Sequence, residues 1–145
     1  MTEKKGTGAL VFDAYVDGGC RGNPGPAGCA AVLVSDGQVI LKAGQFLGDS
    51  TNNRAEYAGL LLALKKAAEF DNCRGLRVFT DSQLMARQIT GVYKVRDAEL
   101  QKLRALALEK IAAFDSFEIH DIPRSKNVLA DKLVNKSIDA GTNKK

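Results

Sequence analysis

A glycine- and proline-rich segment between two apolar runs limits most strongly how this chain can fold. Residues 10–17 alternate in the manner of a β-strand and end in an acid, Asp17. Glycines and prolines then crowd residues 18–28, where unusual φ angles and close backbone contacts are easiest. Because the next apolar run, residues 28–35, is again typical of a strand, the segment joins two strands and does not open a helix as a dinucleotide-binding loop does. An isolated Asp-Gly pair is also typical of a hairpin turn, so Asp17 alone assigns no function.

The periodicity of the remaining chain predicts one α/β domain. An Asp36-Gly37 turn separates the second strand from a third at 38–46. Later elements are expected as strands at 76–80 and 116–121 and as helices at 53–70, 81–89, 97–114 and 125–140. This order predicts a mixed five-stranded sheet, in which an antiparallel meander is extended by parallel strands reached through helical crossovers, with helices on its faces.

The two polar ends of the chain are expected to be flexible tails, at residues 1–8 and 141–145, around a single domain at 9–140. The amino terminus has no apolar core of a signal peptide, and the leucine-rich run at 60–64 is too short to span a bilayer. Three cysteines without a Cys-x-x-Cys pair argue against a disulfide framework and against a cysteine zinc site. We expect a cytoplasmic monomer without membrane contact, and the net charge of +4 is compatible with a polyanionic partner.

Four acids lie where their side chains can converge. Asp17 and Asp81 stand at strand ends, Glu56 is expected in the first turn of a helix, and Asp131 lies on the edge of the last helix. Each has an ordinary structural explanation as well: a capping box from Asn53 to Glu56, a helix N-cap at Asp81, and a solvated helix residue at Asp131. Four acids in distinctive contexts favour a shared site instead, and hard carboxylate oxygens select Mg²⁺ or Mn²⁺.

Four sequence blocks surround these acids, and together they are more specific than any one motif. They are Tyr15-Val-Asp-Gly-Gly-Cys-x-Gly-Asn-Pro-Gly25, Thr51-Asn-Asn-Arg-Ala-Glu56, Thr80-Asp-Ser-Gln83 and Asn127-x-x-Ala-Asp131. In this order and on these elements, the blocks resemble the type 1 ribonuclease H family over nearly the whole domain. The resemblance implies the ribonuclease H-like fold and a catalytic, metal-binding set made of Asp17, Glu56, Asp81 and Asp131.

The resemblance also implies an activity. It implies an endoribonuclease that hydrolyses the RNA strand of an RNA–DNA hybrid and leaves 5′-phosphate and 3′-hydroxyl ends. Two Mg²⁺ ions per site, which Mn²⁺ could replace, would lie about 3.5–4 Å apart, one activating the attacking water and the other stabilising the departing 3′ oxygen. No covalent nucleophile is required.

Matched positions of the family are expected to contact the hybrid. They are the backbone of Cys20 and the side chains of Asn23, Asn52, Asn53 and Gln83. Side-chain amides suit this task because the 2′-hydroxyl of RNA both donates and accepts hydrogen bonds. Thr51, together with Asn23, matches a position near a phosphate of the DNA strand. In isolation, each asparagine could equally serve a turn or a helix cap.

Two features depart from the family pattern. The connection at residues 90–97 is too short for the basic, tryptophan-rich protrusion of many relatives, and the chain has no tryptophan, which predicts weaker hybrid affinity. Where the best-studied relatives have a histidine before the last helix, counting back from Asn127 places Asp121, with His120 one residue earlier. His120 is interpreted as structural unless its strand ends early, and Arg124 is the nearest candidate to bind the scissile or departing phosphate.

Two other functions fit the same pattern of elements. A hybrid-binding module without turnover would be expected to lack one of the four carboxylates, and none is missing. Another metal-dependent nuclease, or a transposase-type phosphoryl transferase, is not separated from a ribonuclease by fold analogy alone. The asparagine-rich set of contact residues favours RNA as the substrate strand.

Overall fold

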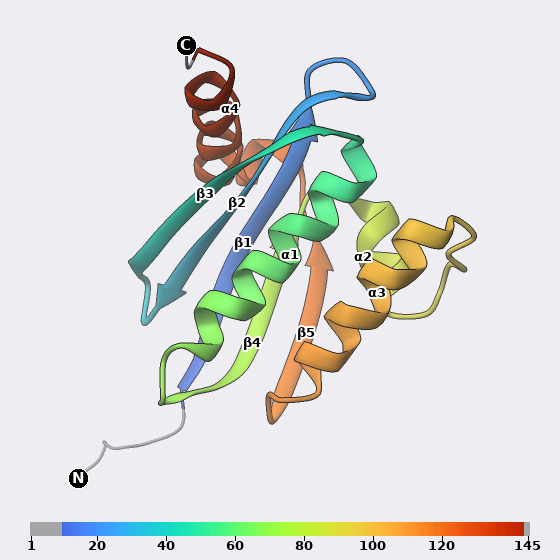
Figure 1. The fold of residues 1–145 in the computed structure, drawn as a ribbon. Helices are drawn as coiled ribbons and strands as arrows, with labels where there is room; N and C mark the ends of the chain where they lie inside the picture. The colour runs from blue at the N-terminus through green and yellow to red at the C-terminus, as the bar shows by residue number, and fades with distance from the viewer. Residues whose placement is uncertain (1–9, 144–145) are drawn as a thin grey trace, which may run out of the picture.

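A mixed five-stranded sheet forms the centre of the computed structural model, which describes residues 10–143 (Figure 1). The strands are β1 Leu10–Cys20, β2 Gly25–Ser35, β3 Gln38–Ser50, β4 Cys73–Thr80 and β5 Ser116–Asp121. Their order in the sheet is β3-β2-β1-β4-β5. The meander of β1, β2 and β3 is antiparallel, whereas β4 pairs in parallel with both β1 and β5. The predicted fold class and sheet are confirmed.

The first hairpin is longer than the sequence predicted. Pairing between β1 and β2 continues to Cys20 opposite Ala27, which leaves only residues 21–24 outside the two strands. The glycines at 18 and 19 are thus part of β1, because cross-strand pairing, not side-chain type, decides where the strand ends. The second hairpin turns at Asp36 and Gly37, with φ angles of 56° and 76°, as a two-residue hairpin turn of this composition requires.

Side-chain caps mark the start of three of the four described α-helices, and the last α-helix begins without one. The helices are α1 Asn52–Ala68, α2 Gln83–Ile89, α3 Ala98–Ile111 and α4 Val128–Thr142, with a 3₁₀ turn at Arg124–Lys126. Thr51 Oγ1 accepts a 3.2 Å hydrogen bond from Arg54 N, so the capping box from Asn53 to Glu56 does not form, and Glu56 lies beyond the first turn of α1. Ser82 Oγ accepts from Met85 N at 3.1 Å, so Asp81 precedes the α2 cap.

The last helix starts and ends later than expected. The 3₁₀ turn replaces its predicted first turn, and α4 continues two residues past Ala140, where Thr142 Oγ1 donates a 2.8 Å hydrogen bond to the carbonyl of Ile138. Residues 141 and 142 of the expected carboxy-terminal tail are therefore helical. The expected amino-terminal tail, residues 1–8, lies outside the described residues, as do residues 144 and 145.

Helices cover the two faces of the sheet unequally. In Figure 1, α1, α2 and α3 lie on one face, and α4 lies on the other, beside β2 and β3. The main core lies under α1 and includes Phe12, Val16, Leu33, Tyr57, Leu60, Leu64, Leu76 and Val78. The contact of α4 is smaller, because it rests on Ala30, Val134 and Ile138 with Leu133 at the margin. Within residues 10–143, no helix is long and apolar enough to span a membrane.

Candidate active site

Two parallel strands bring two carboxylates to the same end of the sheet. In the β1–β4 pair, Val16 lies opposite Thr80, so the residues that follow, Asp17 and Asp81, emerge side by side. Asp17 still belongs to β1 and is only 6% exposed. Asp81 lies between β4 and the cap of α2, so its carboxyl group is not used in helix capping.

Two glycines allow α1 to lie directly against β1 at this point. A Cβ atom at Gly18 would collide with the backbone carbonyl of Ala55, and one at Gly59 would lie 2.6 Å from the carbonyl oxygen of Asp17. Glu56 lies on α1 between these two contacts. The close approach of the backbones therefore carries the Glu56 side chain to the end of β1.

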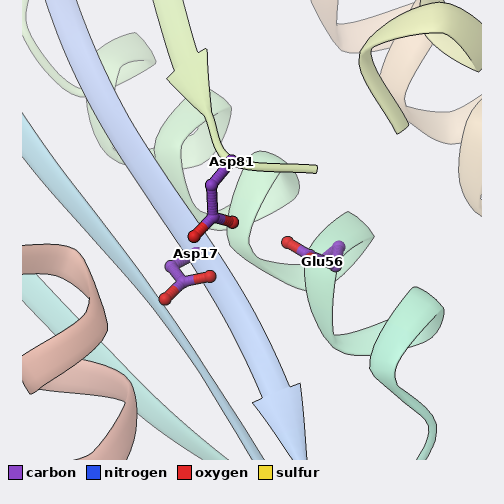
Figure 2. A group of neighbouring side chains, drawn as sticks. All are labelled: Asp17, Glu56 and Asp81. Carbon is purple, nitrogen blue, oxygen red and sulfur yellow. The ribbon is translucent and has the colours of Figure 1, made fainter. Parts of the chain in front are cut away.

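The carboxyl groups of Asp17, Glu56 and Asp81 meet at one point (Figure 2). One oxygen from each lies within 4.8 Å of the other two. Asp17 Oδ1 accepts a 2.9 Å hydrogen bond from Gly18 N. Glu56 Oε1 and Asp81 Oδ2 are buried, and neither has a hydrogen-bond partner among residues 10–143. Because burying a polar oxygen without a hydrogen bond is costly, these atoms favour binding of a cation or water from outside the chain.

Burial and mutual repulsion raise two carboxyl pKa values in this group. The pKa of Glu56 rises from 4.5 to about 9, first because burial disfavours the charged form and then because Asp17 and Asp81 repel it. The pKa of Asp17 rises from 3.8 to about 7 through burial and then through the charge of Asp81, with Asp131 adding to the effect. A bound cation would reverse both effects by pairing with the charged forms.

The donor set of this group fits a hard divalent cation. All of its side-chain ligands are carboxylate oxygens, which Mg²⁺ and Mn²⁺ prefer over nitrogen or sulfur. Two of the carboxylates, those of Glu56 and Asp81, present a buried oxygen that makes no hydrogen bond within residues 10–143. The site can therefore hold a metal without rearranging hydrogen bonds to those two oxygens.

Asp131 lies beside this group and not within it. It is in the first turn of α4, and its carboxyl is not one of the three that lie within 4.8 Å of one another. With Asp17 and Glu56 it lines a cleft of about 290 Å³. The start of α4 is held by Asn127, which is 1% exposed and whose Nδ2 donates a 2.8 Å hydrogen bond to the carbonyl of Val16. This bond ties α4 to the residue that precedes Asp17.

Three of the predicted hybrid-binding residues form a hydrogen-bonded group at the cleft. Asn52 Oδ1 accepts from the backbone N–H of Cys20 at 3.0 Å and from its thiol at 3.2 Å. Asn23 Oδ1 accepts from the backbone N–H of Asn52 at 3.2 Å. Both asparagine oxygens are thus used within the protein, while neither Nδ2 group makes a hydrogen bond within the described part of the chain.

The other predicted contact residues do not belong to this hydrogen-bonded group. Thr51 caps α1. Asn53 and Gln83 are exposed residues in the first turns of α1 and α2. Their contacts with a hybrid remain predictions.

Arg124 and His120 lie in different surroundings. Arg124 lines the cleft, with its Nε 3.6 Å from Asp81 Oδ2 and its side chain 84% exposed. The strand β5 continues to Asp121, so it does not end before His120. His120 Nε2 lies 2.8 Å from Glu118 Oε1, and the ring stacks on Phe79 with the centroids 5.7 Å apart. Arg124 is therefore directed at the carboxylates, whereas His120 is held by its neighbours on the sheet.

Comparison with known proteins places the four acids within a region of similarity to ribonuclease H. A family model described as "Reverse transcriptase-like" matches residues 15–137, which contain all four acids. A ribonuclease HI of Halobacterium salinarum is 42% identical over 127 residues, which cover 87% of this chain. The crystal structure of RNase H1 from the same archaeon has a TM-score of 0.87 at 41% identity, over 90% of this chain and 98% of that chain. The chain belongs to the type 1 ribonuclease H family.

Two further ribonuclease H structures are similar over nearly their whole length. The N-terminal RNase H domain of a Mycobacterium tuberculosis protein has a TM-score of 0.89 at 35% identity, over 93% of this chain and 98% of that chain. LC11-RNase H1, in complex with an RNA/DNA hybrid, has a TM-score of 0.85 at 38% identity, over 90% of this chain and 99% of that chain. This chain spans 63% of the length of the halobacterial ribonuclease HI and 36% of a Mycobacterium tuberculosis protein named as bifunctional.

The ribonuclease H domain of this chain has a short connection between α2 and α3. The helix α2 ends at Ile89 and α3 begins at Ala98, and residues 90–97 contain no further helix. As predicted, this segment leaves little room for an inserted protrusion.

Sequence reasoning assigned no role to three residues that build this ribonuclease H site. Gly59 did carry a signal, since a glycine inside a helical pattern often marks a close packing contact. Asn127 belonged to a recognised block, but its bond to Val16 joins residues 111 positions apart. Arg21 is a cation in a loop of small residues, and nothing local indicates that it reaches α4.

Proposed function

We propose that this chain is an endoribonuclease that hydrolyses the RNA strand of RNA–DNA hybrids and leaves 5′-phosphate and 3′-hydroxyl ends. The observation that carries the proposal is the group of three carboxylates within 4.8 Å, two of which present buried oxygens that make no hydrogen bond in the described part of the chain. Water is the proposed nucleophile, because the thiol of Cys20 donates to Asn52 and burial raises its pKa. The RNA/DNA hybrid bound to the related LC11-RNase H1 supports the choice of substrate.

Mg²⁺ is the proposed cofactor, with two ions per site when substrate is bound and Mn²⁺ as a substitute. Asp17, Glu56 and Asp81 would hold the metal, and Asp131 would complete the set from the side of the cleft. When bound, the ions supply Lewis-acid activation of water and stabilise charge on the departing oxygen. The chain itself contributes fixed positions, because two strand ends and one closely packed helix hold the ligands before substrate arrives.

Residues at the cleft are proposed to select RNA over DNA. Asn52 and Asn23 have their oxygens bound within the protein, so each can present its Nδ2 group to a 2′-hydroxyl or sugar oxygen. The proposed set of hybrid contacts is the backbone of Cys20 with Asn23, Asn52, Asn53 and Gln83. Thr51, with Asn23, is proposed to lie near a phosphate of the DNA strand.

The test is a cleavage assay on three duplexes of one sequence, RNA–DNA, RNA–RNA and DNA–DNA, each with Mg²⁺, Mn²⁺ or EDTA. We expect metal-dependent cutting of the RNA strand of the hybrid alone, since the carboxylates bind the metal and the amides sense the 2′-hydroxyl. End-labelled products should carry 5′-phosphates and 3′-hydroxyls. Equal cutting of the DNA duplex would indicate a different metal nuclease. Hybrid binding without any cutting would indicate a binding module.

Arg124 is proposed to bind the scissile or departing phosphate, for which its guanidinium provides paired donors beside Asp81. Arg124→Ala is expected to lower the turnover of hybrid about 10-fold or more. His120→Ala is the matched control, and it should be nearly silent because His120 bonds to Glu118 and stacks on Phe79. Turnover is measured at saturating hybrid over a range of pH. Loss of activity in the histidine variant alone, with a shifted pH profile, would assign the role to His120.

We further propose that the protein acts as a monomer in the cytoplasm. The three cysteines are free thiols in the structure, which is compatible with a reducing compartment. Light scattering of the purified protein, with and without hybrid, tests the monomeric state.

A further inference from the structure

Arg21 is one of only two cations among the described residues that line the cleft. The other is Arg124, whereas the remaining charged residues of the lining are acidic, namely Asp17, Glu56 and Asp131. The two arginines are therefore the side chains of this lining that can pair directly with the phosphates of a strand that enters the cleft. Arg124 lies at Asp81, before the start of α4. Arg21 reaches α4 farther along the helix, beyond Asp131.

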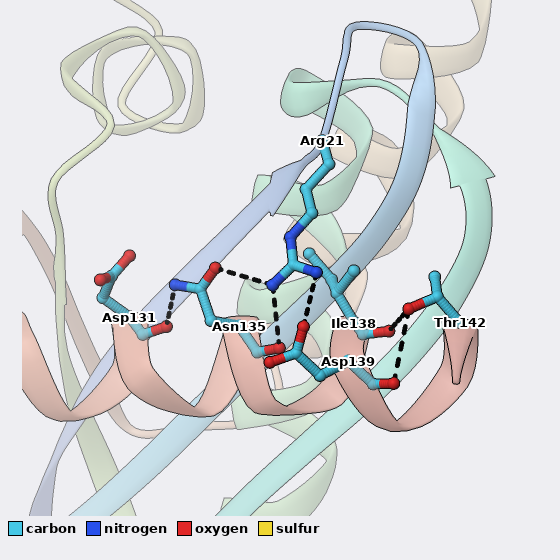
Figure 3. A network of polar contacts seen from close by, with 6 residues as sticks. All are labelled: Arg21, Asp131, Asn135, Ile138, Asp139 and Thr142. Carbon is cyan, nitrogen blue, oxygen red and sulfur yellow. Dashed lines mark hydrogen bonds and ion pairs between the residues drawn. The ribbon is translucent and has the colours of Figure 1, made fainter. Parts of the chain in front are cut away.

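The helix α4 holds the guanidinium of Arg21 in place (Figure 3). Asp131, Asn135 and Asp139 are spaced by four residues and so lie one turn apart on one side of the helix. Arg21 Nη1 donates to Asp139 Oδ1 at 2.6 Å, and Nη2 donates to the backbone and side-chain oxygens of Asn135 at 3.4 and 3.3 Å. Asn135 Nδ2 in turn donates to the carbonyl of Asp131 at 3.1 Å. The arginine is thus oriented from the side of the helix that carries Asp131.

The guanidinium can still bind another anion. Arg21 Nε makes no hydrogen bond within residues 10–143, and the side chain is 46% exposed although it lines the cleft. Its ion pair with Asp139, which is 57% exposed, is of the surface type that contributes little to stability and is screened by salt. A phosphate can therefore replace the carboxylate of Asp139 at little cost, and a guanidinium binds phosphate with two parallel hydrogen bonds.

We propose that Arg21 binds a backbone phosphate of the RNA strand that is being cut, on the far side of Asp131 from Arg124. Arg21 directly follows Cys20, the last residue of β1, and lies in the same loop as Asn23; Cys20 and Asn23 are proposed to contact the hybrid. A strand that passes from Arg124 across the carboxylates thus reaches Arg21 next. The inference rests on the proposed function and names a substrate-positioning residue for that same site.

The test compares Arg21→Ala with Asp139→Asn and with Arg74→Ala in steady-state cleavage of a hybrid over a series of KCl concentrations. Arg21→Ala is expected to raise KM on the order of 10-fold, with kcat near that of the wild type, and to lower the slope of log KM against log salt by about 1. Asp139→Asn should leave KM unchanged or lower it, because the competing carboxylate charge is removed. Arg74 is the matched control: it is an exposed arginine 3.8 Å from Asp115, on the strand that leads to Asp81 but at its opposite end.

The outcomes separate a phosphate contact from a structural role. If Arg21 only holds α4, Asp139→Asn will raise KM as Arg21→Ala does, and the salt slope of Arg21→Ala will equal that of the wild type. Either this result or an unchanged KM in Arg21→Ala overturns the proposal. Thermal midpoints check the folding of each variant. Should Arg21→Ala unfold, Arg21→Lys keeps the charge but not the paired donors, so it should raise KM by a smaller factor with the wild-type salt slope.

A failure of the proposed function is distinguishable from a failure of this inference. If the wild type does not cut hybrids at all, the proposed function fails. The affinity for a fluorescent hybrid, measured by anisotropy over the same salt series, then still tests Arg21. Equal affinities and slopes for the wild type and Arg21→Ala would overturn the phosphate contact.

Discussion

Replacing Asp17 or Asp81 with asparagine is expected to lower the kcat of hybrid cleavage on the order of 10³-fold or more, with the fold intact. The amide keeps the shape of the side chain but removes the charge from an oxygen that would bind the metal. Charge stabilisation by a catalytic metal is worth several kcal/mol, which corresponds to such a factor in rate. The measurement is kcat at saturating hybrid and Mg²⁺, with circular dichroism as the check on folding.

Asp13→Asn is the matched control for these two variants. Asp13 lies on β1, the strand that also carries Asp17, and pairs with Arg77 Nε at 2.7 Å, but it does not line the cleft. This variant should cut hybrids at the wild-type rate. Retained activity in both the Asp17 and the Asp81 variant would contradict the assignment of the carboxylate site.

The second large effect concerns stability: the metal-free protein is expected to become less stable as pH rises. The pKa values of Asp17 and Glu56 in the folded protein, about 7 and about 9, lie above their ordinary values of 3.8 and 4.5. The folded state therefore binds these protons more tightly than the unfolded chain does. The stability that the protonated Asp17 and Glu56 contribute is fully present below their ordinary pKa values of 3.8 and 4.5. It is lost as pH rises through the folded-state pKa values, about 7 and then about 9. Thermal midpoints measured in EDTA, from pH values near the ordinary pKa values up to about 9, should fall as pH rises.

Asp81→Asn tests the cause of this decline. Removing the Asp81 charge relieves repulsion on both Asp17 and Glu56, so the variant should have a higher thermal midpoint than the wild type without metal and a weaker dependence on pH. Added Mg²⁺ should stabilise the wild type more, because it binds the folded site preferentially. Equal Mg²⁺ shifts in both proteins would argue against a carboxylate metal site. A midpoint that climbs with pH in the wild type would contradict the raised pKa values.

Local patterns were sufficient to predict the elements of the sheet and their order. The alternation in β1 and the Asp36-Gly37 pair predicted the meander, because strand period and positive φ are properties of a few neighbouring residues. Element ends were predicted less well. Pairing with Ala27 extends β1 to Cys20, and a hydroxyl cap at Ser82 places the start of α2 after Asp81. Both ends depend on which partner completes the backbone hydrogen bonds.

The sequence predicted which acids stand at the ends of strands and on helices, and its four blocks predicted Asp17, Glu56, Asp81 and Asp131 as one set. The distances between these acids come from the packing of the elements: oxygens of three carboxyl groups lie within 4.8 Å of one another, and Asp131 lies to one side in the same cleft. The bond from Asn127 to Val16 and the ion pair of Arg21 with Asp139 join residues 111 and 118 positions apart. Local periodicity does not encode such contacts, because the distance between two elements is set by how closely their backbones pack, as at Gly59. That packing also removes water from the Glu56 carboxyl, and this burial is the main cause of its raised pKa.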